Sequence, residues 1–392
     1  MTLAPVHELP TPDLMAQAHS GKLVAEITRE IGDASISFAR YMHRALYAPA
    51  LGYYMAGQQR FGEGGDFTTA PETSPVFARC VANALASVFA QLGYGDVLEL
   101  GAGSGALAHG LLEHLAATDR LPRRYSILEL SPDLKRTQEH YLRGVLPPRL
   151  LGRVNWLSRL PESFSGVVIA NEVADALPVT RFRVERDYVA EIRTACARGE
   201  LHDRIVPASD ELAARVDTLQ SQLGFRLPRE YCSELSLDLP AWVSTLAETL
   251  HQGALLIVDY GYPRREYYSA ERHMGTLLCH YRHRVHDDPY WYPGLQDISA
   301  SVDFTGVAEA ATQAGLELEG YTNQAGFLID TGLLDELPRV QGMAPQQITA
   351  RQQLHVLLSP GEMGERFGVI GLSRGLREPL PGFQFRSLTH RL

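Results

Sequence analysis

Along this chain of 392 residues, segments with the apolar pattern of strands alternate with segments whose apolar residues have helical spacing. Short apolar runs, which are typical of buried strands, lie at 97–100, 125–129, 154–157 and 166–170. After the first run, leucines at helical spacing predict a helix from Ala106 to Leu115. Strands that alternate with helices predict an α/β fold around a parallel sheet.

The spacing of apolar residues along the chain changes after Pro178. Residues 180–185 and 188–193 alternate between apolar and polar positions, which indicates antiparallel strands, and an apolar strand pattern returns at 254–259. The chain is therefore expected to divide into an N-terminal extension of helices and loop over 1–90, a Rossmann-like core over 91–177 and 238–392, and an inserted α+β segment on the substrate side over 178–237.

The most informative run joins a strand to a helix through alternating glycines. Glu99 lies near the end of an apolar strand, and Gly101, Gly103 and Gly105 follow it. Glycine lets the backbone turn tightly and approach a ligand with no Cβ in the way. A carboxylate here would repel the pyrophosphate of a dinucleotide, whereas it suits the ammonium group of S-adenosylmethionine (SAM). The spacing also fits a dinucleotide fingerprint, and a turn that only packs a helix on a strand is the plainer alternative.

A second apolar strand also ends in a carboxylate. Glu129 lies roughly 20 residues past the glycines, where an acidic side chain is placed to bind ribose hydroxyls. A carboxylate can accept hydrogen bonds from both hydroxyls at once. The alternative is an exposed acid at a strand end, and the presence of Glu99 on the neighbouring strand favours ribose binding.

The third candidate group follows the apolar run at 166–170. Asn171, Glu172 and Asp175 come directly after it. Ligands of open parallel sheets bind beyond the carboxyl ends of the strands, so these side chains should lie on the same edge as Glu99. The alternative is that Asn171 and Glu172 cap the next helix, which would not exclude a chemical role.

Composition narrows the class of protein. The net charge of −10 argues against broad nucleic-acid binding, which needs a basic surface. The four cysteines are widely spaced, which indicates reduced thiols and no metal site. Neither a signal peptide nor an apolar run of membrane-spanning length is evident, so we expect no membrane association and a cytoplasmic location.

Several further motifs together resemble the MidA-like family of SAM-dependent methyltransferases. They are Gly52-Tyr53-Tyr54, the loop from Gly65 to Glu72 (G-D-F-T-T-A-P-E), the glycine turn, Asn171-Glu172 with Asp175-Ala176-Leu177-Pro178, Asp259-Tyr260-Gly261, Gly275-Thr276-Leu277, Pro293-Gly294 and Gln296-Asp297-Ile298. The resemblance covers nearly the whole chain and implies a class I methyltransferase sheet with SAM as cofactor. It departs from the family at Val173, Ala174 and Ser301, where the family has two aromatic residues and a histidine.

The resemblance also implies a substrate and a mechanism. Mitochondrial members of the family methylate an arginine of a respiratory-complex subunit, so a protein substrate of this kind is expected, with a homodimer left open. Glu172 would take the proton from the arginine, with Asp175 as the second candidate, and Asn171 would orient Glu172 or bind SAM. The glycine-flanked loop would cover the cofactor, with Phe67 stacking and Thr68 or Thr69 hydrogen-bonding after the hinge at Gly65.

Two other functions stay open. The chain could be an assembly factor that binds SAM with little turnover, although intact Glu99, Glu129 and Glu172 speak against this. It could also be a nicotinamide-dependent oxidoreductase, which Glu99 and the G-D-F-T-T loop disfavour.

Overall fold

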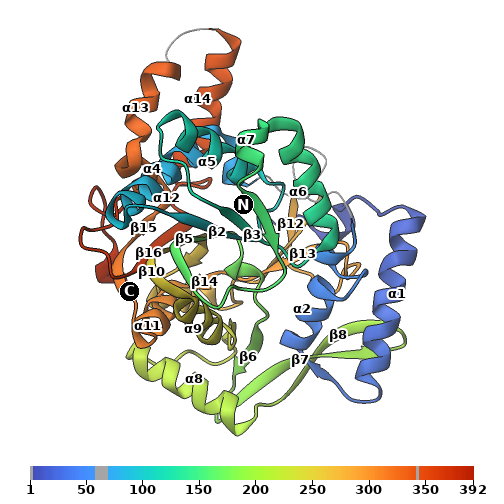
Figure 1. Ribbon diagram of the computed structural model, residues 1–392. Coiled ribbons are helices and arrows are strands. Elements are labelled where there is room, and N and C mark those ends of the chain that lie inside the picture. The colour runs from blue at the N-terminus through green and yellow to red at the C-terminus, as the bar shows by residue number, and fades with distance from the viewer. Residues whose placement is uncertain (1–2, 58–68, 341–343) are drawn as a thin grey trace.

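The computed structural model describes residues 3–57, 69–340 and 344–392, and within them the chain is built around an eight-stranded sheet (Figure 1). Its order is β15-β16-β10-β5-β2-β3-β4, with β14 beside β10. The strands are β2 (Asp96–Leu100), β3 (Tyr125–Leu128), β4 (Val154–Leu157), β5 (Phe164–Asn171), β10 (Leu250–Tyr262), β14 (Val302–Asp303), β15 (Glu317–Asn323) and β16 (Phe367–Arg374).

The centre of this sheet is parallel, as the alternation of strands and helices predicts. β10, β5, β2, β3 and β4 pair in parallel, and β16 joins β10 and β15 in antiparallel pairs. Val168 of β5 lies between Leu98 of β2 and Leu255 of β10, and all three side chains are buried. Strands that are buried on both faces are continuous apolar runs, which is why the sequence shows them so clearly.

Helices cover both faces of the sheet. One apolar core packs α4 (Pro75–Leu92), α5 (Ala106–Ala117), α6 (Pro132–Val145), α7 (Pro148–Leu151), α12 (Gln324–Leu328) and α14 (Pro345–Leu358) against it. The other core packs α9 (Leu239–Thr249) and α11 (Phe304–Gln313). Three short helices, α3 (Ala70–Thr73), α10 (Arg264–Tyr267) and α13 (Leu334–Glu336), lie between these elements in the chain. A central parallel sheet with helices on both faces is the α/β architecture that the sequence predicts.

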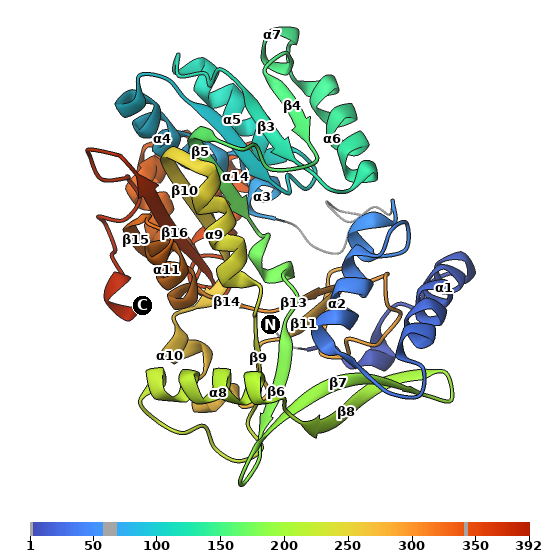
Figure 2. The ribbon, with the colours of Figure 1, turned by 60° about the horizontal axis from the view of Figure 1, so that its bottom comes forward.

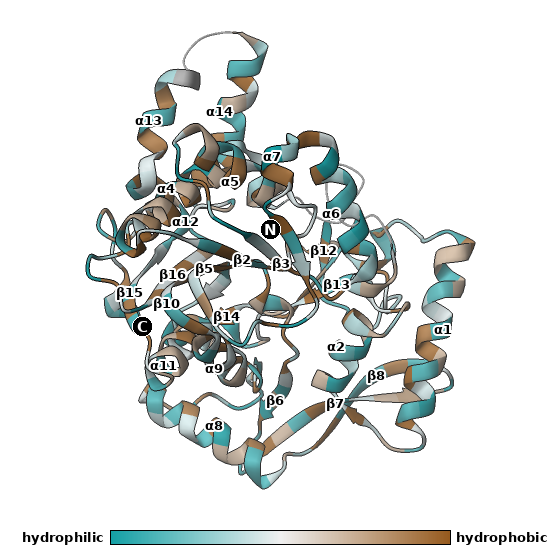
Figure 3. Ribbon diagram, viewed as in Figure 1, coloured by the Kyte–Doolittle hydropathy of each residue, from teal (hydrophilic) through white to brown (hydrophobic). Residues whose placement is uncertain are grey.

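Helix α4 corrects the expectation that the chain has no apolar run of membrane-spanning length. By length and composition alone, Pro75–Leu92 could cross a membrane, and Figure 3 shows this helix in pale and brown shades. However, 56% of its residues are buried inside the protein, where Phe77, Val81 and Leu85 belong to the core beneath α5. A helix that is apolar all round is typical of a protein core as well as of a membrane, and the packing here is that of a core helix.

A second, five-stranded sheet lies beside the core within the described residues, and Figure 2 shows it with helices α1 (Leu14–Ile31) and α2 (Phe38–Tyr47) next to it. It contains β1 (Ile36–Ser37), β6 (Thr180–Val184), β7 (Val189–Ala197), β8 (Glu200–Pro207) and β9 (Cys232–Leu235), accompanied by α8 (Asp210–Leu223). β1 lies far upstream of the other four strands and pairs with β7 through Ile36 and Thr194. The inserted segment and the N-terminal extension therefore share a sheet, while the division into domains stays a prediction.

The N-terminal helices form the other side of this second layer. α1 (Leu14–Ile31) and α2 (Phe38–Tyr47) pack with Val179, Cys279 and Ile298 in an apolar core of their own. Cys279 and Ile298 belong to a small sheet of β11 (Leu278–Tyr281), β12 (Arg284–His286) and β13 (Asp297–Ser299). α2 and β13 thus meet on the side of the core that faces the carboxyl ends of the strands.

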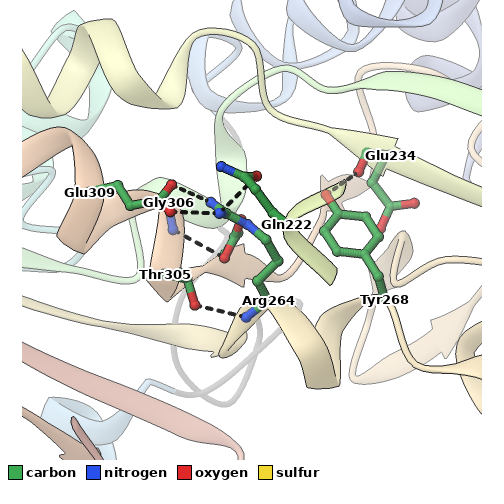
Figure 4. Close-up of polar contacts among 8 residues, drawn as sticks. Gln222, Glu234, Arg264, Tyr268, Thr305, Gly306 and Glu309 are labelled. Carbon is green, nitrogen blue, oxygen red and sulfur yellow. Dashed lines mark hydrogen bonds and ion pairs between the residues drawn. The ribbon is translucent and has the colours of Figure 1, made fainter. Parts of the chain in front are cut away.

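One guanidinium group ties the inserted segment to the core, as Figure 4 shows. Arg264 donates to both carboxylate oxygens of Glu309 at 2.8 Å and, through Nε, to Asp303 at 2.9 Å. Its Nη1 also donates to Gln222 of α8 at 3.0 Å. The planar guanidinium makes these bonds in one fixed fork, so α8 and α11 are held at a defined spacing.

We expect Arg264→Lys to lower the free energy of unfolding by about 1–3 kcal/mol, because a single ammonium group cannot reproduce the fork to Glu309 and Asp303. Arg226→Lys is the control, since Arg226 pairs with Asp217 at 2.8 Å on an exposed surface, and its effect should stay within about 0.5 kcal/mol. Urea denaturation followed by circular dichroism measures both. Equal effects of the two substitutions would contradict a fastening role for Arg264.

Candidate active site

A cavity lies at the carboxyl ends of β2, β3 and β5. Its lining combines the glycine turn, three strand-end acids and a wall from the N-terminal extension: Tyr47, Tyr54, Met55, Thr69, Pro71, Glu99, Leu100, Gly101, Ala102, Gly103, Ser104, Ala106, Leu107, Leu128, Glu129, Leu130, Ser131, Leu134, Asn171, Glu172, Val173, Ala176 and Trp242. The sheet therefore brings Glu99, Glu129, Asn171 and Glu172 to one place, as the strand-end argument predicts.

The glycine turn needs its glycines. Gly101, Gly103 and Gly105 have φ angles of 60°, 54° and 91°, in the left-handed region that side chains disfavour. A Cβ on Gly101 would lie 3.3 Å from the Val173 side chain. Gly105 caps α5 and does not line the cavity, so its contribution is to the start of that helix.

Glu99 lies at the floor of the cavity and is almost completely buried. The hydroxyl of Tyr125 donates to its Oε2 at 2.8 Å. Burial and the nearby Glu129 raise the pKa of Glu99 to about 7, although the Tyr125 hydrogen bond acts in the opposite direction. A cationic ligand group beside Glu99 would favour the ionised form, which fits the ammonium group of SAM.

Glu129 is held by a chain of polar contacts. Its Oε1 accepts from the backbone N–H of Ser131 at 2.8 Å, and its Oε2 accepts from Gln138 at 2.9 Å. Gln138 also donates to the carbonyl of Gly103 at 3.1 Å and accepts from the indole of Trp156 at 2.9 Å. These contacts fix Glu129 relative to the glycine turn. Gln138 and Trp156 were not predicted as site residues, because nothing in their local sequence pattern marks them.

The backbone conformation of Glu172 is unusual. Its φ of 55° places a non-glycine residue in the left-handed region directly after β5. Such conformations cost of order 1–3 kcal/mol and concentrate at functional sites. The side chain accepts from Asn171 Nδ2 at 3.1 Å and from the backbone N–H of Ala70. Burial and the charge of Asp259 raise the pKa of Glu172 to about 8.

Asp259 builds the turn that follows Glu172. Its Oδ2 accepts from the backbone N–H groups of Val173, Ala174 and Asp175 at 2.8–3.2 Å, and its Oδ1 accepts from the N–H of Tyr260 at 2.8 Å. The side chain is fully buried. Asp259 was not predicted as a site residue, although its place at the end of an apolar run is the same signal that identified Glu99.

Asp175 lies beside the cavity without lining it. Its backbone carbonyl accepts from the N–H of Ala300 at 3.0 Å. Burial and the charges of Asp259, Asp297 and Glu172 raise its pKa well above the usual range. Asp175 is therefore placed to act on the electrostatics of the site, while Glu172 faces the cavity directly.

The predicted cover of the cavity is partly visible. Gly65, Phe67 and Thr68 lie outside the described residues. Thr69 is described, lines the cavity and caps α3 together with Glu72. The N–H of Ala70 at the start of this helix reaches Glu172, so the end of the G-D-F-T-T-A-P-E motif contacts the strand-end acid.

The structure also locates the departures from the family pattern. Val173 lines the cavity, so its small side chain bears on ligand shape, whereas Ala174 is packed in the core. Ser301 does not line the cavity, and its N–H donates to the hydroxyl of Thr276 at 3.0 Å. Among the described residues, no group of His, Cys, Asp and Glu is arranged to hold a metal ion.

The cavity residues fit SAM on the evidence of their own geometry. The left-handed glycines leave room where a Cβ would stand, and a fixed carboxylate lies beside them. Asn171 Oδ1 is buried without a hydrogen-bond partner in the described part of the chain, so it has an acceptor to offer a ligand. Fold and site together define a class I SAM-dependent methyltransferase.

Comparison with known proteins names the family. A model of a family of S-adenosyl-L-methionine-dependent methyltransferases matches residues 80–322, and the chain belongs to that family. A Burkholderia thailandensis structure bound to S-adenosylhomocysteine, described as a methyltransferase candidate, is 41% identical with a TM-score of 0.92, covering 98% of this chain and all of that one. A native structure from the same organism is 40% identical with a TM-score of 0.90, and covers 98% of this chain and all of that one. The resemblance to MidA-like methyltransferases and the SAM cofactor are confirmed.

Curated relatives correct the predicted location. The Drosophila melanogaster protein named protein arginine methyltransferase NDUFAF7 homolog, mitochondrial, is 29% identical over 97% of this chain and 93% of its own length. The human protein arginine methyltransferase NDUFAF7, also named mitochondrial, is 26% identical over 86% of this chain and 80% of its own length. These names contradict the prediction of a cytoplasmic location, which was therefore wrong. The four free thiols indicate only a reducing environment and do not distinguish one such compartment from another.

We expect Glu129→Ala to weaken binding of S-adenosylhomocysteine roughly tenfold or more, because hydrogen bonds to a charged group contribute about 1.5–3 kcal/mol. Glu139→Ala is the matched control, since Glu139 lies on α6 and contacts Lys135 at 3.9 Å. Titration calorimetry measures both affinities. An unchanged affinity of the Glu129 variant would rule this residue out as the ribose ligand.

Proposed function

We propose that this methyltransferase acts on an arginine side chain of a protein substrate. The observation that supports this most is Glu172, a carboxylate at the cavity wall, held in a costly backbone conformation and surrounded by further acids. Besides burial, the charges that raise the pKa of Glu172 and Asp175 are those of neighbouring carboxylates, Asp259 above all. Such a site suits a cationic nucleophile. Relatives named as arginine methyltransferases point to the same substrate.

An arginine is a poor nucleophile as it stands, because its guanidinium stays charged at neutral pH. SAM supplies the electrophilic methyl group when it is bound at Glu99, Glu129 and the glycine turn. Glu172 would hold one nitrogen of the substrate, draw the positive charge toward itself and take the proton that the nitrogen loses. The walls of the cavity would position the nucleophile, and positioning contributes much of the rate in such displacements.

The neighbours of Glu172 have supporting roles in this scheme. Asn171 donates to its Oε1 at 3.1 Å and the N–H of Ala70 contacts it, so its carboxylate has a fixed orientation. Asp175 would be a second acid beside the substrate cation, whose charge would favour its ionised form. The pKa of Glu172 near 8 suits a base that works close to neutral pH, because efficient proton transfer requires a pKa near the operating pH.

The alternatives are weaker. A nicotinamide-dependent oxidoreductase does not belong to the family that the chain matches. An assembly factor with little turnover would have no need to hold Glu172 in a left-handed conformation, whose cost must be offset elsewhere. A respiratory-complex subunit as the substrate, and a homodimer, stay predictions.

We expect Glu172→Gln to retain the fold and the affinity for S-adenosylhomocysteine and to lose about 10²–10³ of the methylation rate, as for other groups that stabilise a transition state. Glutamine keeps the shape but neither offsets a cation nor accepts its proton. The assay follows transfer of the labelled methyl group of SAM into lysate of a deletion strain. The exposed Glu162→Gln is the control. Equal labelling by the wild type and Glu172→Gln would show that Glu172 is only structural.

The rate should also depend on pH through the same carboxylate. Because Glu172 must be ionised and its pKa is raised to about 8, kcat/KM should rise about tenfold per pH unit below pH 8 and level off above it. The affinity for S-adenosylhomocysteine, measured at each pH, separates this effect from cofactor binding. A profile that is already flat between pH 6 and pH 8 would contradict the role of Glu172 as the base.

A further inference from the structure

The N-terminal extension contributes an aromatic wall to the cavity. Tyr47, the last residue of α2, and Tyr54, in the 3-10 helix η2 (Tyr53–Met55), both line the cavity. Their rings stack at a centroid distance of 5.6 Å and an interplanar angle of 24°. Tyr53 packs edge-on against Tyr54 at 5.0 Å, which fixes the ring from another side. Within this pair the Tyr54 ring is therefore held firmly at the cavity surface.

Behind Tyr54 lies a buried carboxylate. The Tyr54 hydroxyl donates to Asp297 Oδ1 at 2.8 Å, and Asp297 is only 4% exposed. His280 Nδ1 lies 3.8 Å from the other carboxylate oxygen. Burial raises the pKa of Asp297 to about 6, so the group is ionised at pH 8, while burial and the neighbouring carboxylates raise the pKa of the Tyr54 hydroxyl and keep it a donor.

A second contact ties the wall to the candidate base. The Tyr47 hydroxyl donates to the carbonyl of Ala176 at 3.0 Å, in the 3-10 helix η3 (Ala174–Ala176) that begins two residues after Glu172. Burial, Asp297 and then Asp175, in the same short helix, raise the pKa of both tyrosines, so both hydroxyls stay donors. The rings and the ionised Asp297 therefore produce negative potential on the side of the cavity next to Glu172.

We propose that Tyr54 is a specificity-determining residue that receives the substrate cation on its ring, and that Asp297 is the positioning residue that orients and polarises it. This deepens the proposed arginine methyltransferase function and rests on it. A guanidinium over an aromatic face is attracted by the ring quadrupole, more strongly when it is desolvated. A phenol that donates to a carboxylate carries more electron density on its ring, and it cannot rotate away from the cavity.

The experiment compares two probes that differ in charge but hardly in shape. They are the capped tripeptide acetyl-Gly-Arg-Gly-amide and its counterpart with citrulline, which is neutral. Binding to the full-length protein saturated with S-adenosylhomocysteine is measured by ligand-detected NMR titration at pH 8. The wild type should prefer the arginine peptide, and Asp297→Asn, which keeps an acceptor for Tyr54 but removes the charge, should lower this preference about tenfold.

Two more variants separate the ring from the hydroxyl. Tyr54→Phe keeps the ring and should retain part of the preference, whereas Tyr54→Leu should abolish it, and both should leave the affinity for S-adenosylhomocysteine unchanged. Asp203→Asn is the control, because Asp203 accepts from the Tyr290 hydroxyl at the same 2.8 Å but lies on β8 of the five-stranded sheet and does not line the cavity. It should not change the preference.

The outcomes are distinguishable. A wild type that binds both peptides equally would overturn the proposed arginine substrate itself. A wild type that prefers arginine, with the preference intact in Asp297→Asn and Tyr54→Leu, would overturn this inference and leave the proposed function in place. A parallel loss of S-adenosylhomocysteine affinity in the Tyr54 variants would overturn it as well, because the ring would then pack against the cofactor.

Discussion

The active site depends on four backbone N–H groups that converge on the carboxylate of Asp259. Three of them belong to Val173, Ala174 and Asp175, and the fourth to Tyr260. Buried N–H groups must have acceptors, and one carboxylate here satisfies the whole turn after β5. This turn holds Glu172 in its left-handed conformation with its side chain at the cavity. Without it the strand would end in a conventional loop, and nothing would offset the cost of that conformation.

The same constraint concentrates negative charge in a small volume. Besides burial, the charge of Asp259 raises the pKa of both Glu172 and Asp175, and Asp297 on β13 raises the pKa of Asp175 further. Burying carboxylates without cations is costly unless hydrogen bonds or a change of protonation compensate. The protein uses both, since Asp259 is saturated with N–H groups and the pKa of Glu172 is raised to about 8. A cationic ligand would relieve the remaining repulsion, which links substrate binding to the electrostatics of the site.

Strand ends were the part of the site that local pattern could predict. Glu99, Glu129 and Asn171 each follow an apolar run, and a parallel sheet brings the carboxyl ends of its strands to one edge. The glycine turn was predictable as well, because left-handed backbone requires glycine and the spacing is visible in the chain. Gln138 and Trp156 could not be found in this way. They act through a side-chain contact with Glu129, and α6 shows only an ordinary amphipathic pattern.

The sequence by itself determined the parallel core, its cofactor edge and the acids on that edge, because hydrophobic periodicity and glycine spacing are local properties of a chain. The tertiary structure alone decided the wall that faces this edge. Tyr54 and Asp297 are 243 residues apart and meet only because α2 packs on β13, and the bonds from Asp259 to the turn after Glu172 span more than 80 residues. Burial, and with it the raised pKa of Glu172, follows from the same long-range packing, which no local pattern encodes.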